Sequence, residues 1–436
     1  MEKSSQVNSK FLTSLRIAAF FTRTQEMALI ILFPAIRDSL GLNYLSLGIL
    51  ENIRLLIQAA GTPIWELIAD LGNRKWRLVV FAGFWGVWTL GCGLAANFWQ
   101  LLLVRFIACL GFGCFIPLAV SLVKDAFSER QSETILQVLD VGSMLGLVVM
   151  AILLAELLNI TAIGWRYGLV ILGGLSILAG AAIAMLFKDP QRSPVTEKPA
   201  PNPVVRSSSW FKDQLLSLVE ILKHPSVWLH LIQGSLVTTT VNTLVIFSVT
   251  WLVDIKHLTQ VDAPFVFAAM LVSMAVGSQA GSWAADLAER RWPKVGRIAA
   301  VQAAILLSLP VMLYLILRAN SLPIIMVSAI FLAFFLNWNR RSLQQPQIEA
   351  CLPPTLQNKA AFWIDLVQAG CAAVVIIGFS HYADDRNLTA MLRILGIDCW
   401  AAALAVTTAY YVIYPAELHR KVKAAGISAD SPGGHP

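Results

Sequence analysis

The feature that most limits how this chain folds is a succession of twelve long apolar segments separated by short polar connections. Each segment reaches the ~20 residues that an α-helix needs to cross the hydrocarbon core of a bilayer. A backbone in lipid must satisfy its own hydrogen bonds, so such segments fold as helices. The sequence therefore predicts an all-α membrane protein. The expected spans are 11–36, 44–70, 77–96, 99–124, 135–158, 164–187, 226–254, 263–288, 297–318, 322–346, 358–382 and 390–415.

Composition narrows the class of protein further. Apolar residues make up 57% of the chain and charged residues 14%, a balance typical of polytopic membrane proteins and not of soluble ones. The net charge of +7 indicates membrane orientation, because Lys and Arg gather in cytoplasmic loops. With the N-terminus in the cytoplasm, 23 of the 33 Lys and Arg residues fall on the cytoplasmic side and six on the opposite side. We therefore expect a multi-pass protein of the cell (inner or plasma) membrane with both termini in the cytoplasm.

The six cysteines show no CxxC spacing, and five of them lie inside apolar segments, where they pack as small hydrophobic side chains. We expect no disulfide, no metal site and no cofactor. The expected partners are a small-molecule substrate and the lipid bilayer, with no nucleic acid. We expect the protein to be a monomer.

One stretch of the chain occurs twice. Residues Gly61 to Trp76 read GTPIWELIADLGNRKW, and residues Gly277 to Trp292, 216 positions later, read GSQAGSWAADLAERRW. A repeat at this distance predicts two similar halves, an organisation found in many secondary transporters. The expected domains are an N-terminal six-helix bundle at 1–187, a cytoplasmic linker with an amphipathic helix at 188–225, a C-terminal six-helix bundle at 226–415 and a cytoplasmic tail at 416–436.

The repeat also predicts a conformational lock. Asp70 and Asp286 lie at the ends of apolar helices, where a carboxylate opposes the helix dipole and needs a cation nearby. Arg74 and Arg290 follow within about one turn. We expect these four residues to hold two helices together in one conformational state. The alternative is that the basic residues only mark a cytoplasmic loop.

Four features of the sequence belong together: the DLGNRK sequence at 70–75, Arg105 followed by Gly111 and Gly113, the Gly-Trp-Arg sequence at 164–166 and the basic central linker. With them the chain resembles the major facilitator superfamily of transporters over essentially its whole length. The resemblance implies two six-helix bundles related by pseudo-two-fold symmetry around a central cavity, and alternating access. Among subgroups, the chain looks most similar to the spinster-like lysolipid transporters. Those have an adjacent Asp-Arg pair in the first helix, where this chain has Arg23 and Glu26.

Charged side chains inside the spans need a reason, since one at mid-bilayer costs about 2.5–3.5 kcal/mol on insertion scales. Arg23 and Glu26 lie about 60° apart around the first helix, so they share a face. We expect both to bind substrate, together with Arg54 and Gln58 in the second span. Glu26 is also the expected proton-coupling residue. The alternative is that these groups form internal ion pairs that join helices and bind no ligand.

The second half offers uncharged polar groups. We expect Thr239 and Asn242 in the seventh span, and Asn337 and Trp338 in the tenth, to complete the substrate site. A cationic half that faces an uncharged polar half suits an organic anion or a zwitterionic amphiphile. The alternatives are a threonine that bonds to its own helix backbone and a tryptophan that anchors the chain at the membrane interface.

Two further carboxylates occupy matching helices of the two halves. Asp140 lies in the fifth span and Asp365 in the eleventh, each near the cytoplasmic end. We expect them to act in gating or proton coupling. The alternative is again an ion pair within one half.

These features favour a secondary active transporter of a small organic anion or zwitterionic amphiphile, working by alternating access and coupled to protons. An enzyme is not expected, because the sequence has no HExxH, GxSxG, GxxxxGK[ST] or CxxC motif. A membrane sensor or scaffold derived from a transporter is the remaining alternative. Uptake into proteoliposomes that follows an imposed proton gradient separates a transporter from both.

Overall fold

The computed structural model describes residues 2–70, 74–160, 163–186, 215–293, 295–383 and 388–424. Within these ranges the chain contains helices and no strand. The first half contains α1 (Glu2–Leu40), α2 (Tyr44–Asp70), α3 (Arg74–Val79), the π-helical turn η1 (Val80–Phe84), α4 (Gly86–Leu94), α5 (Phe98–Phe112), α6 (Phe115–Ala126), α7 (Glu129–Ile160) and α8 (Gly164–Leu186). The second half contains α10 (Pro225–Asp254), α11 (Asp262–Arg291), α12 (Gly296–Leu317), α13 (Leu322–Leu336), η3 (Arg340–Gln344), α14 (Gln345–Cys351), α15 (Pro354–Tyr382), α16 (Leu388–Leu392), η4 (Arg393–Asp398), α17 (Cys399–Thr407) and α18 (Tyr410–Ala424).

The expected membrane spans agree with these helices. Over the described residues, each of the twelve spans coincides with one helix or with a run of consecutive helices. The third span, for example, corresponds to α3, η1 and α4, and the tenth to α13, η3 and α14. Ten of the described segments are long and apolar enough to cross a membrane by length and composition, and α13 is a shorter apolar helix. The prediction of an all-α membrane fold is confirmed.

The C-terminal end of the second bundle differs from the prediction. We expected the bundle to end at residue 415, but α18 continues to Ala424. Glu417 accepts a hydrogen bond of 2.9 Å from the backbone N–H of Ser226 and lies 2.8 Å from Nδ1 of His224. A carboxylate at the N-terminus of α10 is favoured by the helix dipole, so this contact holds α18 at Glu417 against the start of α10.

The predicted linker lies mostly outside the described residues. Its last part, residues 215–221, is helical. Ile221 is buried there while Leu215, Leu216 and Val219 are exposed, and the amphipathic helix stays a prediction.

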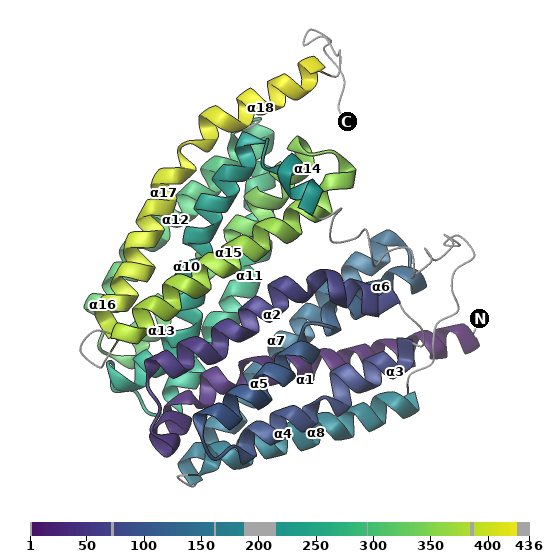
Figure 1. Ribbon diagram of the computed structural model, residues 1–436, viewed down its shortest axis with the longest axis vertical. Coiled ribbons are helices and arrows are strands. Elements are labelled where there is room, and N and C mark those ends of the chain that lie inside the picture. The colour runs from purple at the N-terminus through teal and green to yellow at the C-terminus, as the bar shows by residue number, and fades with distance from the viewer. Residues whose placement is uncertain are drawn as a thin grey trace.

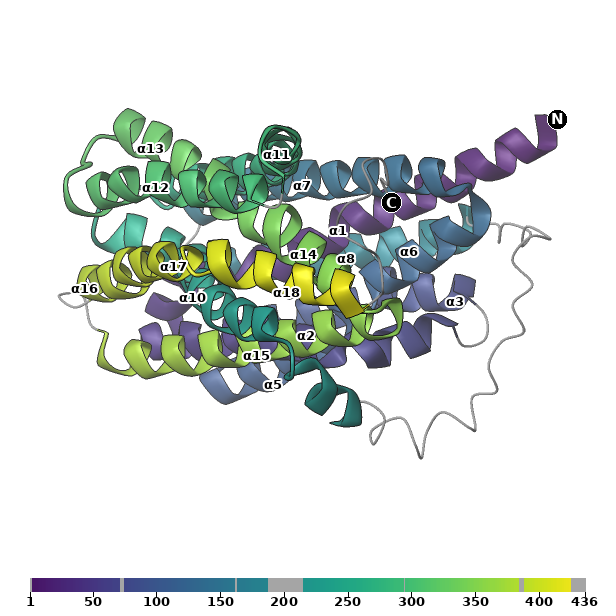
Figure 2. The same cartoon turned by 90° about the horizontal axis from the view of Figure 1, so that it is seen from above.

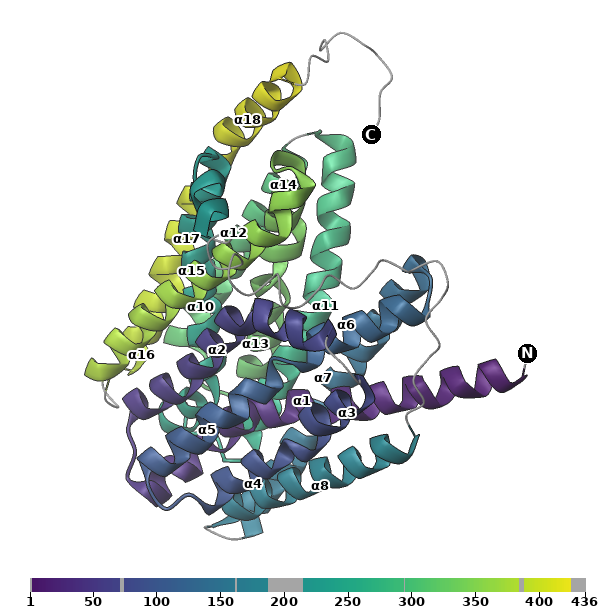
Figure 3. The same ribbon diagram turned by 45° about the vertical axis from the view of Figure 1, so that its right-hand side comes forward.

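The helices form two groups that follow the order of the chain. Figure 1 shows the first-half helices, coloured purple to blue, as one group and the second-half helices, coloured teal to yellow, as the other. Three helix pairs make most of the contact between the groups, since α2 lies beside α15, α7 beside α11 (Figure 2) and α1 beside α10. In Figures 1 and 3 the groups diverge toward the side on which the two chain ends lie.

Close helix packing within each half depends on glycine. A Cβ built on Gly83 would lie 2.1 Å from the Cα of Gly180, and one built on Gly277 would lie 1.9 Å from the carbonyl oxygen of Phe334. No larger residue fits at either position, so η1 packs directly on α8 and α11 on α13. Gly277 is the first residue of the repeated stretch, which therefore also marks a helix contact.

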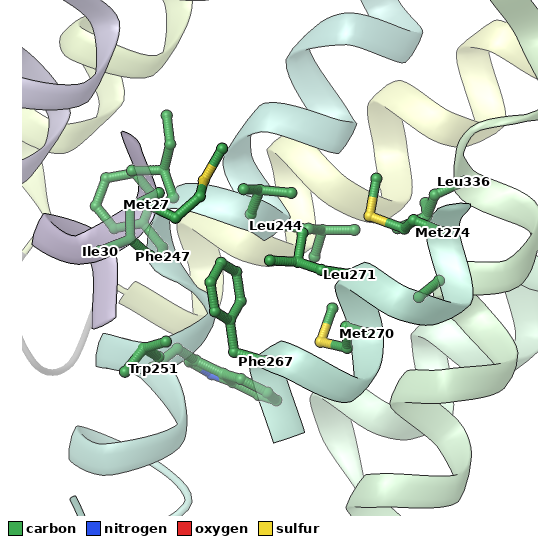
Figure 4. Close-up of a cluster of buried hydrophobic side chains, with 14 of the residues drawn as sticks. Met27, Ile30, Leu244, Phe247, Trp251, Phe267, Met270, Leu271, Met274 and Leu336 are labelled. Atoms are coloured by element: carbon green, nitrogen blue, oxygen red, sulfur yellow. The ribbon is translucent and has the colours of Figure 1, made fainter. Parts of the chain in front are cut away.

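At one end of the molecule the two halves are packed together. Every residue from 24 to 36 of α1 and from 243 to 252 of α10 is buried. Figure 4 shows Met27 and Ile30 of α1 beside Phe247 of α10, and all three belong to one hydrophobic cluster. A helix that is buried all round lies at the centre of an assembly. We call this end, where α1 and α10 finish, the closed end.

Candidate functional site

The charged residues predicted in the first helix form an ion pair. Nη1 of Arg23 lies 3.0 Å from Oε2 of Glu26, about one turn away on α1. The side chain of Arg23 is 33% exposed and that of Glu26 is 6% exposed. The guanidinium is therefore open to a ligand, whereas the carboxylate is enclosed by protein.

Glu26 is held by three donor side chains from two helices. Its second oxygen, Oε1, accepts a hydrogen bond from Nε2 of Gln58 and lies 3.5 Å from Nη1 of Arg54. Arg54 also donates to Oε1 of Gln58 at 3.1 Å. The structure thus brings together the four substrate-site residues that the sequence predicts in the first half.

A second carboxylate, Glu51, extends this network. It pairs with Nε of Arg54 at 2.9 Å and with Nη2 of Arg105 at 2.8 Å. Glu51 is fully buried and the Arg105 side chain is 1% exposed. Three guanidinium groups thus face two carboxylates, which leaves one positive charge in excess. A buried charge that loses its partner costs about 3–5 kcal/mol, so each member depends on its neighbours.

Arg105 connects the network to the backbone of α1. Its Nη2 donates to the carbonyl of Glu26 at 2.7 Å, and its Nη1 donates to the carbonyl of Gln25 at 3.3 Å. The Gln25 side chain donates to Ser176 at 2.9 Å and accepts from Thr89 at 2.7 Å. Sequence analysis did not single out these last three residues. The available signal was Gln25 itself, a second polar residue next to Glu26 inside an apolar segment.

The polar residues of the seventh span lie on α10 in different surroundings. Thr239 is buried, whereas Asn242 is partly exposed. Nδ2 of Asn242 donates to the carbonyl of Thr238 at 2.9 Å. The hydroxyl of Thr238 donates to Oε1 of Gln368 on α15 at 3.4 Å, and Nε2 of Gln368 donates to the carbonyl of His230 at 2.8 Å. Both amide side chains are therefore oriented by carbonyl acceptors. Gln368 is not among the residues predicted from the sequence, because it carries no charge.

Asn337 and Trp338 lie where α13 ends. Asn337 follows the last residue of α13 and is exposed, whereas Trp338 is buried. Nε1 of Trp338 donates to the carbonyl of Phe334 at 2.8 Å. Its ring covers Gly281 of α11, where a Cβ would lie 2.6 Å from the ring. Trp338 therefore packs α13 against α11.

The two predicted gating carboxylates have different surroundings. Asp365 accepts a hydrogen bond of 2.6 Å from Arg340, a residue of the same half. Asp140 is exposed on α7, and its backbone carbonyl accepts a hydrogen bond of 2.7 Å from Ser143. Asp365 is thus paired within its own half, and the gating role of both carboxylates stays a prediction.

In the second copy of the repeat, Asp286 pairs with Arg297 and not with the predicted Arg290. Arg297 also pairs with Glu289 and donates to the carbonyl of Ser342 at 3.3 Å. The reason is tertiary: α12 starts soon after α11 ends and returns beside it, which places Arg297 next to the last turns of α11.

The first copy of the repeat cannot be compared in the same way. The side chains of Asp70 and Arg74 lie outside the described part of the chain. Their role in a lock stays a prediction.

Contacts between the halves concentrate at the closed end. Asp254 accepts hydrogen bonds from both Nη groups of Arg37, with Nη2 at 3.0 Å, and from the hydroxyl of Tyr44 at 2.9 Å. Nearby, α2 and α15 approach so closely that a Cβ on Gly48 would lie 2.9 Å from Oγ of Ser380. Sequence analysis assigned no partner to Arg37, because spacing does not show which helices from different halves meet.

A separate small apolar pocket lies within the second half. Its lining is apolar apart from Ser248 and includes Leu244, Met270 and Leu332. It offers no cation to an acidic group, so the charged network on α1, α2 and α5 remains the better candidate site for an anion.

The chain is similar to a known family profile and to known proteins. The sequence profile of the Major Facilitator Superfamily matches residues 15–378. Spinster homolog 1 of Bos taurus is 26% identical over 174 residues, which are 38% of this chain and 32% of that protein. The 4-hydroxybenzoate transporter PcaK of Pseudomonas aeruginosa is 30% identical over 158 residues, which are 36% of this chain and 34% of that protein. The matched region thus spans about a third of the length of these relatives.

Solved structures resemble the fold over nearly its whole length. A bacterial homolog of the human lysosomal transporter Spinster, in an inward-facing and unoccupied conformation, superimposes with a TM-score of 0.70 at 17% identity and covers 94% of this chain and 97% of its own. The D-xylose-proton symporter superimposes with a TM-score of 0.69 at 10% identity and covers 93% of this chain and 98% of its own. At these identities the likeness is one of fold.

Proposed function

This chain belongs to the Major Facilitator Superfamily of secondary transporters, and we propose that it moves a small organic anion across the membrane together with a proton. The observation that supports this most directly is the position of Glu26. Its carboxylate is held by Arg23, Gln58 and Arg54 in a network with one positive charge in excess. The carboxylate of Glu26 thus lies among donor groups that would also bind the acidic group of a substrate.

Arg23 is the residue expected to bind that acidic group. Its side chain is 33% exposed, compared with 6% for Arg54 and 1% for Arg105. Guanidinium presents a planar fork that matches a carboxylate or phosphate, and it stays charged when water is removed. Arg54 and Gln58 lie close enough to Glu26 to assist from the second helix.

Substrate binding and proton binding are coupled because the substrate replaces Glu26 as the partner of Arg23. When an anion binds Arg23, Glu26 loses this cation and gains a negative charge beside it. Two like charges in a poorly solvated site favour proton uptake by one of them. Glu26 then becomes neutral, so substrate and proton bind cooperatively, as a symporter requires.

Two similarities support different members of the substrate class. PcaK is named a 4-hydroxybenzoate transporter, which supports an aromatic carboxylate. The sequence resemblance to the spinster-like lysolipid transporters is the basis for including a zwitterionic amphiphile, whose phosphate would take the same place on Arg23. A sensor or scaffold remains the alternative function, and it would bind a ligand without accumulating it.

We also propose an orientation in the cell membrane. The distribution of Lys and Arg supports cytoplasmic placement of both termini and of residues 188–225. In that orientation the closed end faces outward and the two halves diverge toward the cytoplasm, which is an inward-facing conformation.

The test uses purified protein in proteoliposomes with an imposed proton gradient, and 4-hydroxybenzoate and a lysophospholipid as probes. We expect the parent protein to accumulate one of them and to bind it more tightly as pH falls. Glu26→Gln should bind at every pH and accumulate nothing. Arg23→Ala should bind poorly at every pH, and Arg23→Lys should restore binding only in part. A parent affinity independent of pH, with Glu26→Gln still concentrating the probe, would leave Arg23 and Glu26 as a structural ion pair.

A further inference from the structure

Asn242 occupies a position in the second half that corresponds to that of Glu26 in the first. The two residues are 216 positions apart, the same spacing that separates Gly61 from Gly277 in the repeated stretch. The fully buried stretch begins at residue 24 of α1 and at residue 243 of α10. Asn242 is thus the last partly exposed residue before that stretch, as Arg23 is on α1.

The apolar contact between the halves shows where Arg23 and Asn242 lie relative to the closed end. Met27, which follows Glu26, lies beside Phe247, which is little more than one turn beyond Asn242 (Figure 4). Both helices finish at the closed end, so Arg23 and Asn242 lie on the same side of this contact and on opposite halves. The two residues therefore lie at similar depths in their halves, as one ligand that reaches both of them requires.

The hydrogen bonds around Asn242 leave two acceptor oxygens on this side of α10, beside one unused N–H of the Asn242 amide. Because its Nδ2 donates to the carbonyl of Thr238, Oδ1 of Asn242 points away from that bond and has no partner among the described residues. Thr238 donates its single hydroxyl proton to Gln368, so its Oγ1 has only lone pairs left. Gln368 is itself held by the carbonyl of His230 at 2.8 Å, which fixes this polarity.

We propose that Oδ1 of Asn242 and Oγ1 of Thr238 form a subsite that accepts a hydrogen bond from a hydroxyl group on the substrate. The inference rests on the proposed function, since Arg23 holds the acidic end of the same molecule. α10 has no Lys, Arg, Asp or Glu between residues 226 and 253, so this side of the helix offers nothing to balance a charged amine. The ligand class is therefore a hydroxylated organic acid, with an anionic group at one end and an uncharged donor at the other.

The test compares matched acids on the purified full-length protein at one pH. Phenylacetate and its ortho-, meta- and para-hydroxy derivatives differ by a single hydroxyl group. We expect the parent to bind one hydroxylated isomer roughly three- to tenfold more tightly than phenylacetate, the range of a neutral hydrogen bond. Asn242→Ala should bring this ratio to about one, whatever its effect on the affinity for phenylacetate. Thr238→Val should reduce the ratio in part.

Thr408→Val is the matched control, because the hydroxyl of Thr408 donates to Ala405 of its own helix region at 2.6 Å. It should leave the ratio at the parent value. Arg23→Ala separates the two possible failures. If Arg23→Ala weakens every acid and Asn242→Ala leaves the ratio intact, the subsite is wrong and the anion site stands. If Arg23→Ala binds all the acids as the parent does, the proposed function fails too. Failure of every acid to bind, or equal binding of all of them, overturns the assignment to hydroxylated acids.

Discussion

Arg37 of α1 and Asp254 of α10 form an ion pair that joins the two halves of the molecule at the closed end. Their side chains are 18% and 10% exposed, so the pair is better shielded than a surface salt bridge. Arg37 also bonds Asp38, which lies 216 positions before Asp254. One guanidinium thus holds carboxylates at corresponding positions of the two halves, and this contact favours the conformation in which the closed end is packed.

Removing the charge of Asp254 should open this end more often. Asp254→Asn keeps the shape of the side chain and should weaken the closed conformation by about 1–2 kcal/mol, the loss of a charge-assisted hydrogen bond. That corresponds to a shift of roughly tenfold in the ratio of open to closed conformations. A cysteine introduced at Ser380 should then react faster with an impermeant thiol reagent added from outside. Asp38→Asn, whose carboxylate is 59% exposed, is the control and should label at the parent rate. Equal labelling of both variants would show that the pair does not hold the closed end.

Substrate binding should take up a proton through Glu26. In a weakly buffered solution above neutral pH, adding the transported anion to the parent should raise the pH, with an uptake of up to about one proton per anion bound. The sign follows from the loss of the Arg23 cation and the arrival of a negative charge beside Glu26. Glu26→Gln has no proton to gain and should show no change in pH. Proton uptake that persists in Glu26→Gln would assign the coupling to another group.

Glu51 should matter more for stability than any exposed carboxylate. Glu51→Gln leaves the buried guanidinium groups of Arg54 and Arg105 short of a counter-charge, which should cost about 3–5 kcal/mol. Thermal unfolding in detergent should report a clear loss in Tm. Glu220→Gln, on the exposed side of the helical segment 215–221, is the matched control and should change stability by no more than about 0.5 kcal/mol. Similar Tm values for both variants would contradict the dependence of the network on Glu51.

The repeated loop should control transport without controlling folding. Asp70→Asn and Asp286→Asn should each reduce uptake while the protein still inserts and purifies normally. Because Asp286 pairs with Arg297, Arg297→Ala should reduce uptake more than Arg290→Ala does. Uptake by reconstituted protein, normalised to the amount of folded protein, measures the effect. Normal transport by both Asp variants would leave the basic residues with a role in orientation only.

The proposed orientation predicts which segments are reached from outside the cell. In a variant without the six native cysteines, a single cysteine at position 200 should not react with an impermeant reagent in intact cells. It should react once the cells are opened. The positive-inside distribution of Lys and Arg is the physical basis. Ready labelling in intact cells would reverse the orientation.

The charged part of the candidate site could be predicted because charge inside an apolar segment is costly and therefore conspicuous. Arg23, Glu26 and Arg54 stood out for this reason, Gln58 lies one turn from Arg54, and the structure brings the four together. Uncharged residues gave a weaker signal. Thr238 was not preferred over its neighbour Thr239, although Thr239 is buried and Thr238 is partly exposed and bonded to Gln368.

The sequence by itself determined the number, length and helical nature of the spans and the presence of two related halves. These follow from local requirements, since each segment must satisfy its own backbone hydrogen bonds in lipid and a repeat is visible in the order of residues. Only the tertiary structure decided which side chains meet. Asp286 pairs with Arg297 and not with Arg290, and Arg37 pairs with Asp254 across the halves. Such pairs depend on how helices distant in the chain lie beside one another, and ion pairs and hydrogen bonds form only over a few ångströms, a proximity that spacing along the sequence does not specify.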